Sequence, residues 1–490
     1  MISRRSLEIC DCIAMTMDPT MLDLSNIQGN ILRGYASFPH AHFLYLSISS
    51  ADNARAFVQQ LLDNDSVTPA QWRVKPDATL NLALTFGGLR AFGLPEESLA
   101  TFPAEFQQGM RFRAKALGDV GDSSPDKWEE PWKTGRVHML VMVYGSTPET
   151  LEARCLTLRK QLPAGVEELA PGQPAGRLQI DGKTTRKEHF GFLDGLTNPD
   201  VAGVPGDDDP EKSLDVGNPD GGGRFRKIPA GEFILGYPGE GGELAPMALP
   251  HLLTQDATYL VLRKLEQDVP KFRRYLEQQA ESFARVLPDG LPAGATSQEF
   301  MAAKMMGRWQ DGSSLVKYPD GPGRDPSNAF GYAEDLAGAR CPLGAHVRRT
   351  NPRDSLGFGG KTMSRRRLIR RGIPYGKHLA PGKQDGESRG IVFLAFNSGF
   401  DQFEFVQQAW INFGDDFEQG NDTDPIAGRR QAVGGSREEG RMMIPGDEAT
   451  GRRPFICFDI PRFVTTKGGD YFFVPSLTGL RLLASGQVEV

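Results

Sequence analysis

The sequence predicts an α+β fold in two parts, and three observations support this prediction. At 490 residues the chain is too long to be organised around one hydrophobic core. Segments with the period of a strand alternate with segments with the period of a helix in both parts. Between the parts, residues 203–226 are rich in Asp, Gly and Pro, which is typical of an exposed connection. We therefore expect a disordered leader at residues 1–20, an N-terminal domain at 21–205, a linker at 206–226 and a C-terminal domain at 227–490.

The elements of the first domain follow from the spacing of its apolar residues. Apolar side chains at every second position, as at Leu44, Leu46 and Ile48, indicate a strand with one buried face. A continuous apolar run indicates a central strand that is covered on both faces. These patterns predict strands at residues 44–48, 80–86 and 137–143, with helices at residues 52–63 and 148–162.

The second domain shows the same patterns but also long irregular segments. Phe272, Leu276 and Phe283 fall near one face of a helix. Strands are predicted at residues 257–263 and 391–396, and helices at residues 269–287 and 400–412. Residues 288–345 and 414–454 contain more irregular chain than a compact domain usually carries, unless the chain wraps a bulky group. A large cofactor would account for these segments.

The composition excludes several classes of function. The chain has 56 Lys and Arg against 62 Asp and Glu, so no overall positive field attracts nucleic acid or an anionic membrane. The longest apolar run, residues 137–144, is far shorter than the roughly 20 residues of a membrane span. The five cysteines form no CxxC pair, which argues against a disulfide framework or a zinc site and favours a reducing compartment. We therefore expect a soluble, cytoplasmic protein whose partner is a small molecule.

His346 is the histidine with the most informative surroundings, because it follows a loop that contains Pro342 and Gly344. A haem ligand must be a neutral imidazole whose other N–H is held by an acceptor that fixes the ring. The predicted helix at 400–412 offers Asp401 and Glu404 as acceptors, and the sequence does not choose between them. An isolated histidine in a loop is more often an ordinary hydrogen-bonded residue, so this prediction depends on the neighbouring segments.

An arginine cluster follows His346, with eight arginines in residues 348–371. Such a cluster is most often a solvated basic face, and a nucleic-acid patch is a further alternative. Haem would instead use these side chains, because its propionates need fixed cations and peroxide cleavage needs a positive charge beside the oxygen that becomes anionic. Arg370 is the candidate for the second role, because Pro374 and Gly376 end its segment and can aim its side chain inward.

Asp194 is the candidate acid-base group. It lies in the glycine-bounded segment Gly191-Phe192-Leu193-Asp194-Gly195, and a carboxylate beside iron could move a proton between the two oxygens of peroxide. An aspartate between glycines is more often only a turn residue. His189, close by in the sequence, is a second polar candidate for the edge of the cofactor.

Together these segments resemble those of the dye-decolourising peroxidase family, in its longer-chain subclass. Three motifs carry the resemblance: the GxxDG pattern of residues 191–195, the loop at residues 341–349 and the arginine segment at residues 368–376. GxxDG alone would be a weak signal, but three motifs in the same order are specific. The resemblance covers nearly the whole chain, from residue 23 to the C-terminal region.

The resemblance implies a fold of two ferredoxin-like domains with antiparallel sheets and flanking helices, the second of which holds haem b. It implies a peroxidase that reduces hydrogen peroxide through an oxyferryl intermediate and oxidises dyes, phenols and similar bulky aromatic donors. His346 would ligate the iron, Asp194 and Arg370 would be catalytic, and the other predicted cofactor contacts are Arg349, His189, Ile391 and Phe393. The alternative interpretation is a haem-binding protein for haem storage, transfer or iron removal. The oligomeric state is not determined by the sequence, and a dimer is compatible with it.

Overall fold

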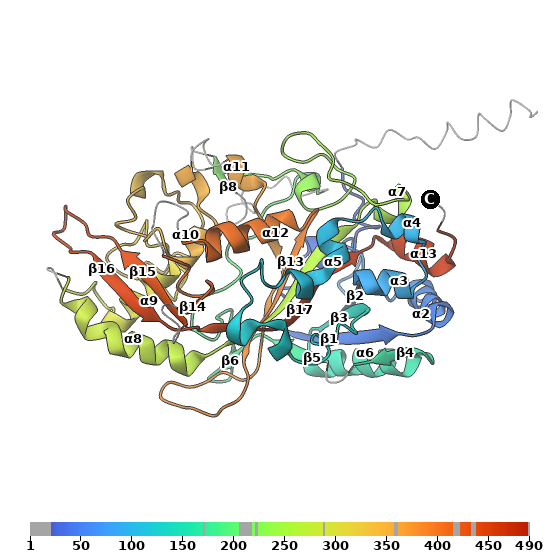
Figure 1. Cartoon of the computed structure of the whole chain (residues 1–490), viewed down its shortest axis with the longest axis horizontal. Coiled ribbons are helices and arrows are strands. Elements are labelled where there is room, and N and C mark those ends of the chain that lie inside the picture. The colour runs from blue at the N-terminus through green and yellow to red at the C-terminus, as the bar shows by residue number, and fades with distance from the viewer. Residues whose placement is uncertain are drawn as a thin grey trace, which may run out of the picture.

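The computed structural model describes residues 21–169, 172–204, 218–220, 224–287, 290–356, 361–414, 422–432 and 438–488 (Figure 1). The predicted leader at residues 1–20 lies outside the described residues. The same holds for most of the predicted linker, whose described part is a hairpin of β8 (Asn218–Asp220) and β9 (Arg224–Arg226). No helix among the described residues is long and apolar enough to cross a lipid bilayer.

The N-terminal half has the ferredoxin-like order of strands. Its elements along the chain are β1 (His40–Ile48), α2 (Ala51–Asp63), β2 (Ala78–Leu84), β3 (Met139–Gly145), α6 (Pro148–Gln161) and β4 (Val166–Glu168). In the sheet these strands lie in the order β2-β3-β1-β4, and β1 is antiparallel to both of its neighbours. Every residue of β3 is buried, as its continuous apolar sequence predicts. The predicted elements of this half are confirmed, although β2 ends at Leu84 and α3 (Phe86–Ala91) begins where the strand was expected to continue.

The C-terminal half repeats this order. Its elements are β10 (Thr258–Gln267), α8 (Val269–Ala284), β11 (Ile369–Arg370), β12 (Ile373–Tyr375), β13 (Gly390–Asn397), α12 (Asp401–Phe405) and β17 (Val464–Val474). Strands β11 and β12 pair with β13, which pairs with β10, which pairs with β17. The predicted helix at residues 400–412 is α12 followed by a π-helical turn at Val406–Asn412. The fold is therefore the predicted α+β fold with antiparallel ferredoxin-like halves.

The two halves share one sheet of ten strands, which their sequences do not reveal. The sheets join where β17 pairs with β2, at Phe473 and Leu84. One hydrophobic core packs on this sheet and includes Leu140 of β3 and Leu260 of β10, both with no exposed surface. Full burial of such side chains contributes roughly 1.5–3 kcal/mol each. The junction is thus buried inside the molecule.

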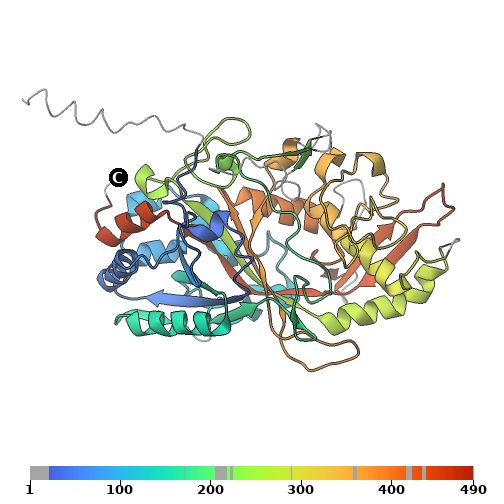
Figure 2. The ribbon, with the colours of Figure 1, turned by 180° about the vertical axis from the view of Figure 1, so that it is seen from behind.

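A lobe with its own core extends from the C-terminal half. It is built from α8, α9 (Ser297–Met306), β15 (Glu438–Ile444) and β16 (Phe455–Ile460), and its core includes Phe272, Met305 and Phe463. Both views of the ribbon place α8, β15 and β16 at the end opposite α2 and α6 (Figures 1 and 2). The segments predicted to be irregular therefore contain α9 and β15, because their apolar residues pack on α8 and not on the sheet.

The remaining elements are short. The helices are α1 (Gly29–Leu32), α4 (Glu96–Leu99), α5 (Ala104–Arg113), α7 (His251–Thr254), α10 (His346–Thr350), α11 (Lys361–Ser364) and α13 (Leu477–Ser485). The strands are β5 (Gln173–Gly176), β6 (Gln179–Ile180), β7 (Lys183–Thr184) and β14 (Gln431–Ala432).

Candidate active site

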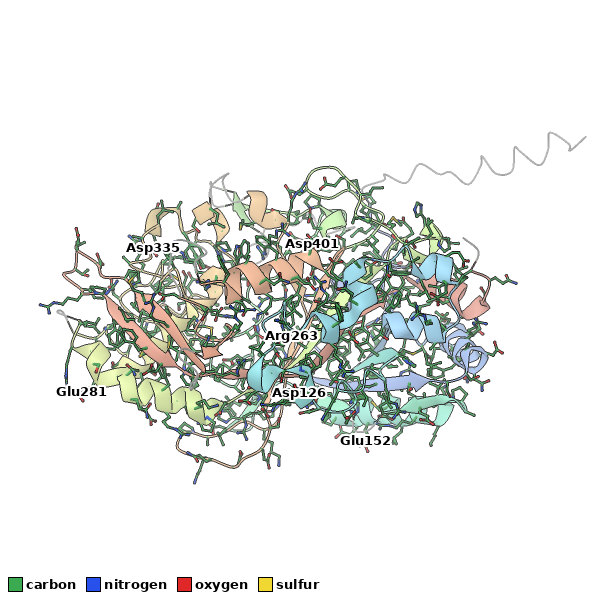
Figure 3. All side chains as sticks on the ribbon, viewed as in Figure 1. Asp126, Glu152, Arg263, Glu281, Asp335 and Asp401 are labelled. Atoms are coloured by element: carbon green, nitrogen blue, oxygen red, sulfur yellow. The ribbon has the colours of Figure 1, made fainter. Side chains whose placement is uncertain are left out.

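A cavity of about 320 Å³ lies between the β10–β13 face of the sheet, α12 and the loop at residues 188–197. Seven arginines and three acidic residues line it: Arg263, Arg308, Arg366, Arg367, Arg370, Arg429 and Arg462, with Asp119, Glu188 and Asp194. Arg263 lies in the middle of the molecule, whereas Glu281 of α8 lies at its periphery (Figure 3). Apolar side chains also line the cavity, and the cationic side chains of its wall outnumber the acidic ones.

His346 begins α10 and lines this cavity. Its Nδ1 lies 2.7 Å from Oδ2 of Asp424, and the other oxygen of Asp424 accepts hydrogen bonds from the backbone N–H groups of Ile426 and Ala427 at 2.8 and 2.9 Å. The Asp424 side chain has no exposed surface, whereas 27% of the His346 side chain remains accessible. The imidazole is thus held on one side by a buried carboxylate and is open on the other side.

Burial and charge act in opposite directions on this pair. Burial alone would lower the pKa of His346, but the charge of Asp424 and its hydrogen bond outweigh that effect and raise the pKa. Burial would raise the pKa of Asp424, but His346 and the two backbone donors keep it below its usual value. Asp424 is therefore an ionised acceptor that fixes the ring, as a haem-ligating histidine requires.

The prediction that Asp401 or Glu404 accepts the hydrogen bond of His346 is wrong, because Asp424 does so. The carboxylate of Asp401 is 72% exposed and pairs with Arg366 at 3.1 Å. Glu404 is buried, but it pairs with Arg113 and accepts a hydrogen bond from Tyr471. Helix α12 turns Glu404 away from His346, while Asp424, 78 residues after His346, reaches it from an irregular segment.

Asp194 lines the cavity from a turn that only glycines allow. Gly191 and Gly195 have φ angles of +96° and +73°, a region that other residues rarely adopt. The backbone N–H of Asp194 donates to Arg186 O at 3.0 Å, and its Oδ1 accepts from the N–H of Gly195 at 2.6 Å. These bonds leave the second carboxylate oxygen available for chemistry.

Arg370 lies on β11 and contacts residues 197 and 198, which follow the turn that carries Asp194. Its backbone N–H donates to Oδ1 of Asn198, and its Nη2 donates to Oγ1 of Thr197, both at 2.9 Å. The next residue, Arg371, donates to the carbonyls of Asn30 and Ile31 and does not line the cavity. Because successive side chains of a strand point to opposite faces, only one of the two arginines can face the cavity.

The structure brings together five of the predicted site residues and separates two from them. Ile391 and Phe393 line the cavity with His346, Asp194 and Arg370.

Arg349 and His189 are not among the described residues that line the cavity, and their contact with the cofactor stays a prediction. Arg349 has no exposed surface, and its guanidinium donates to the backbone carbonyls of Trp410, Phe413 and Asp422. His189 is buried, and its Nε2 lies 2.8 Å from Tyr375 O. Both side chains therefore stabilise the surrounding loops.

Like Asp119, Glu188 is an acidic wall residue that the sequence did not reveal. It is 7% exposed, and its two oxygens accept from the N–H groups of Phe190 and Phe192 and from Nε2 of Gln267. Burial raises its pKa to about 7, although these hydrogen bonds oppose the shift. A Glu just before GxxDG was the only available signal, and the same pattern is common in surface loops.

The wall fits haem. One imidazole with a buried acceptor suits an axial ligand, and the apolar side chains suit the macrocycle. The excess of arginines suits the two negatively charged propionates of haem. One of these arginines, Arg367, has its pKa lowered to about 9 by burial and then by the charges of Arg353 and Arg370. Within the described part of the chain, no cluster of three or more His, Cys, Asp or Glu side chains could hold a metal by itself. A single protein ligand to a cofactor iron is consistent with that result.

Comparison with known proteins gives one family for both halves. The family described as "DyP dimeric alpha+beta barrel domain" matches residues 26–177, and "Dyp-type peroxidase, C-terminal" matches residues 251–437. The "Multifunctional dye peroxidase DyP2" of Amycolatopsis sp. is 30% identical, with 95% of this chain and 96% of that protein covered. The "Dye-decolorizing peroxidase msp1" of Mycetinis scorodonius is 26% identical, with 95% and 88% covered.

Solved structures of the same kind share the fold. An ancestral D-type dye-decolorizing peroxidase matches with a TM-score of 0.77 and 26% identity, covering 94% of this chain and 99% of that one. A dye-decolorizing peroxidase in complex with 2,6-dimethoxyphenol matches with a TM-score of 0.75 and 25% identity, covering 95% and 100%. The similarity therefore extends over both ferredoxin-like halves and the lobe.

Proposed function

This chain belongs to the dye-decolourising peroxidase family, and on that premise we propose how its own residues perform the reaction. The enzyme is a haem-dependent peroxidase that oxidises dyes and phenols. When bound, haem supplies the iron centre at which hydrogen peroxide is cleaved and which then accepts electrons from the reductant. The roles of the side chains around that centre are the proposal.

His346 would hold the iron through Nε2, because Nδ1 faces Asp424. The neutral, oriented imidazole is the form that a metal requires, and the buried carboxylate raises its basicity. Two of the wall arginines, Arg366 and Arg367, belong to the group that would fix the propionates.

Asp194 and Arg370 act on peroxide. Asp194 would take a proton from one oxygen of peroxide and give it to the other, departing oxygen, directly or through a water. The guanidinium of Arg370 would stabilise the negative charge that develops on the departing oxygen. Ile391 and Phe393 exclude bulk water from this side of the cavity, which strengthens both interactions.

The observation that carries this proposal is the cavity in which a carboxylate-held imidazole is open toward a wall containing Asp194 and Arg370. The test is to load the full-length protein with haem and to follow its absorbance in a stopped-flow instrument after mixing with hydrogen peroxide. We expect a fast spectral change, followed by return to the resting spectrum when 2,6-dimethoxyphenol is added. A spectrum that does not respond to peroxide would contradict the proposal.

Further details belong to the same proposal. We infer haem b because no CxxCH motif is present for covalent attachment. Hydrogen peroxide and aromatic reductants are the proposed substrates, supported by the phenol complex of a related structure. A cytoplasmic location and a dimeric state stay predictions, the former based on cysteine usage. Extraction of the pigment into acidified organic solvent would test the haem type, since covalently attached haem stays with the protein.

A further inference from the structure

The ten tyrosines of the chain differ in what their hydroxyl groups contact. Three donate to a carboxylate: Tyr237 to Asp256 at 2.6 Å, Tyr318 to Asp325 at 3.0 Å and Tyr471 to Glu404 at 2.6 Å. This difference matters in a peroxidase, because a phenol that loses an electron becomes a strong acid and must release its proton. In a low-dielectric interior, that release needs an acceptor already in hydrogen-bond contact.

Of these three pairs, the Tyr471–Glu404 pair adjoins the cavity. Glu404 directly follows Phe403 on α12, and Phe403 lines the cavity wall. The Phe403 ring lies 6.1 Å from the ring of Phe393, also in the wall, and the guanidinium of Arg263, another wall residue, lies 5.9 Å from the Phe403 ring. Neither Asp256 nor Asp325, nor any residue next to them in the chain, lines the cavity. Tyr471 is therefore linked through Glu404 to the helix that carries the wall residue Phe403.

Tyr471 is enclosed on every side by ordered groups. It lies on β17 opposite Val261 of β10, is 1% exposed, and packs its ring 4.4 Å from the ring of Phe400. Water cannot take its proton, so Glu404 is the available base.

Glu404 is held in place beside the hydroxyl of Tyr471. Arg113 of α5 donates hydrogen bonds to both of its oxygens, and Gln408 Nε2 lies 3.3 Å from Oε2. Arg113 is itself 21% exposed and donates to Gln108 at 2.7 Å, so the network reaches from Tyr471 to the surface at α5. A buried tyrosine, a buried base and a partly exposed cation thus form one continuous path.

We propose that Tyr471 is a redox-active tyrosine that carries oxidising equivalents from the cavity into the protein, with Glu404 as the acceptor of its proton. The proposal rests on the peroxidase function. Hydrogen peroxide is the oxidant: one electron leaves the phenol for the oxidised site in the cavity, the O–H bond breaks, and the proton moves to Oε1 of Glu404. A phenol-class donor at the α5 surface returns one electron and releases its own proton to solvent, while the proton on Glu404 returns to the tyrosine oxygen.

The chain contains a matched control. Tyr259 of β10 is also 1% exposed and packs on Phe400, with 4.8 Å between ring centres. Its hydroxyl has no hydrogen-bond partner among the described residues, and so no acceptor for a proton there. The two tyrosines share burial and ring contact and differ in the carboxylate.

The experiment is freeze-quench electron paramagnetic resonance on the full-length, haem-loaded protein mixed with one equivalent of hydrogen peroxide. We expect a tyrosyl signal in the wild type, loss of most of it in Tyr471→Phe, and retention in Tyr259→Phe. The same signal in Tyr471→Phe, or equal loss in Tyr259→Phe, would overturn the proposal.

A second variant keeps the test decisive if Tyr471→Phe does not fold. Glu404→Gln retains an oxygen that can accept the hydroxyl hydrogen bond but is far too weak a base to take the proton. We expect the tyrosyl signal to be lost in this variant, and an unchanged signal would refute the role of Glu404. If peroxide changes the haem absorbance but no Tyr471-dependent signal forms, only this inference fails; if the absorbance does not change, the peroxidase function fails with it.

Discussion

The exchange of Asp424 for Asn tests the carboxylate behind the iron ligand. The backbone N–H groups of Ile426 and Ala427 face one oxygen of Asp424, so they would hold the amide oxygen of Asn there. The amide NH2 would then face Nδ1 of His346, at the 2.7 Å now spanned by the hydrogen bond. Nδ1 could accept that bond only by moving the ring proton to Nε2, the nitrogen that must be free to bind iron.

The expected magnitude follows from this conflict. Loss of a partner that orients a metal-bound histidine typically reduces metal affinity or activity 10- to 100-fold, which corresponds to about 1.4–2.8 kcal/mol. We expect Asp424→Asn to weaken haem binding by this factor, measured by titrating the apoprotein with haemin and following absorbance. Asp63→Asn is the control, because Asp63 is an exposed residue at the end of α2, does not line the cavity and should leave the affinity unchanged. Unchanged haem affinity and an unchanged spectrum in Asp424→Asn would refute the reasoning.

Three further predictions concern the same cavity. His346→Ala should lose the histidine-ligated spectrum and most of the bound haem, since His346 is the one histidine among the described residues of the wall. A retained histidine-type spectrum would disprove this ligand. Arg370→Gln should keep haem but slow the first peroxide step by about 10²–10³. Asp194→Asn should slow the same step by about 10²–10⁴. Stopped flow measures both rates, and the control is Arg365→Gln, which should react at the wild-type rate because the Arg365 side chain is 49% exposed. Glu188 has a pKa raised to about 7 in the folded protein from 4.5. Its protonated form therefore favours folding, and this stability is fully present below pH 4.5 and is lost as the pH rises through 7, by up to about 3 kcal/mol. Glu188→Gln apoprotein should accordingly show a smaller fall in melting temperature between pH 5 and pH 8 than the wild type, and parallel falls would contradict this.

The shared sheet gives the cavity a rigid wall. Strands β10 and β13, which carry Arg263 and Phe393, are central strands of the ten-stranded sheet. Side chains on central strands are held more firmly than side chains on loops, which favours a fixed geometry around the cofactor. By contrast, Asp194 comes from a glycine turn, so its position depends on the hydrogen bonds that Glu188 and Arg186 make with that turn.

The sequence by itself determined the local structure of this protein. Period-two and continuous apolar patterns predicted the strands, because the spacing of side chains along a strand is fixed by the backbone. The glycines around Asp194 predicted a tight turn, since they tolerate φ angles that other residues avoid. The choice of Arg370 is consistent with strand alternation, which turns Arg371 away from the cavity.

Only the tertiary structure decided which distant groups meet. Asp424, and neither Asp401 nor Glu404, reaches His346 from a segment without periodicity, across 78 residues of sequence. Arg349 lies in the predicted ligand loop but is buried against backbone carbonyls. Periodicity records which face of an element is apolar, whereas the partner of a polar side chain depends on how loops and elements pack in space. That is why the elements were predictable from the sequence and the contacts between them were not.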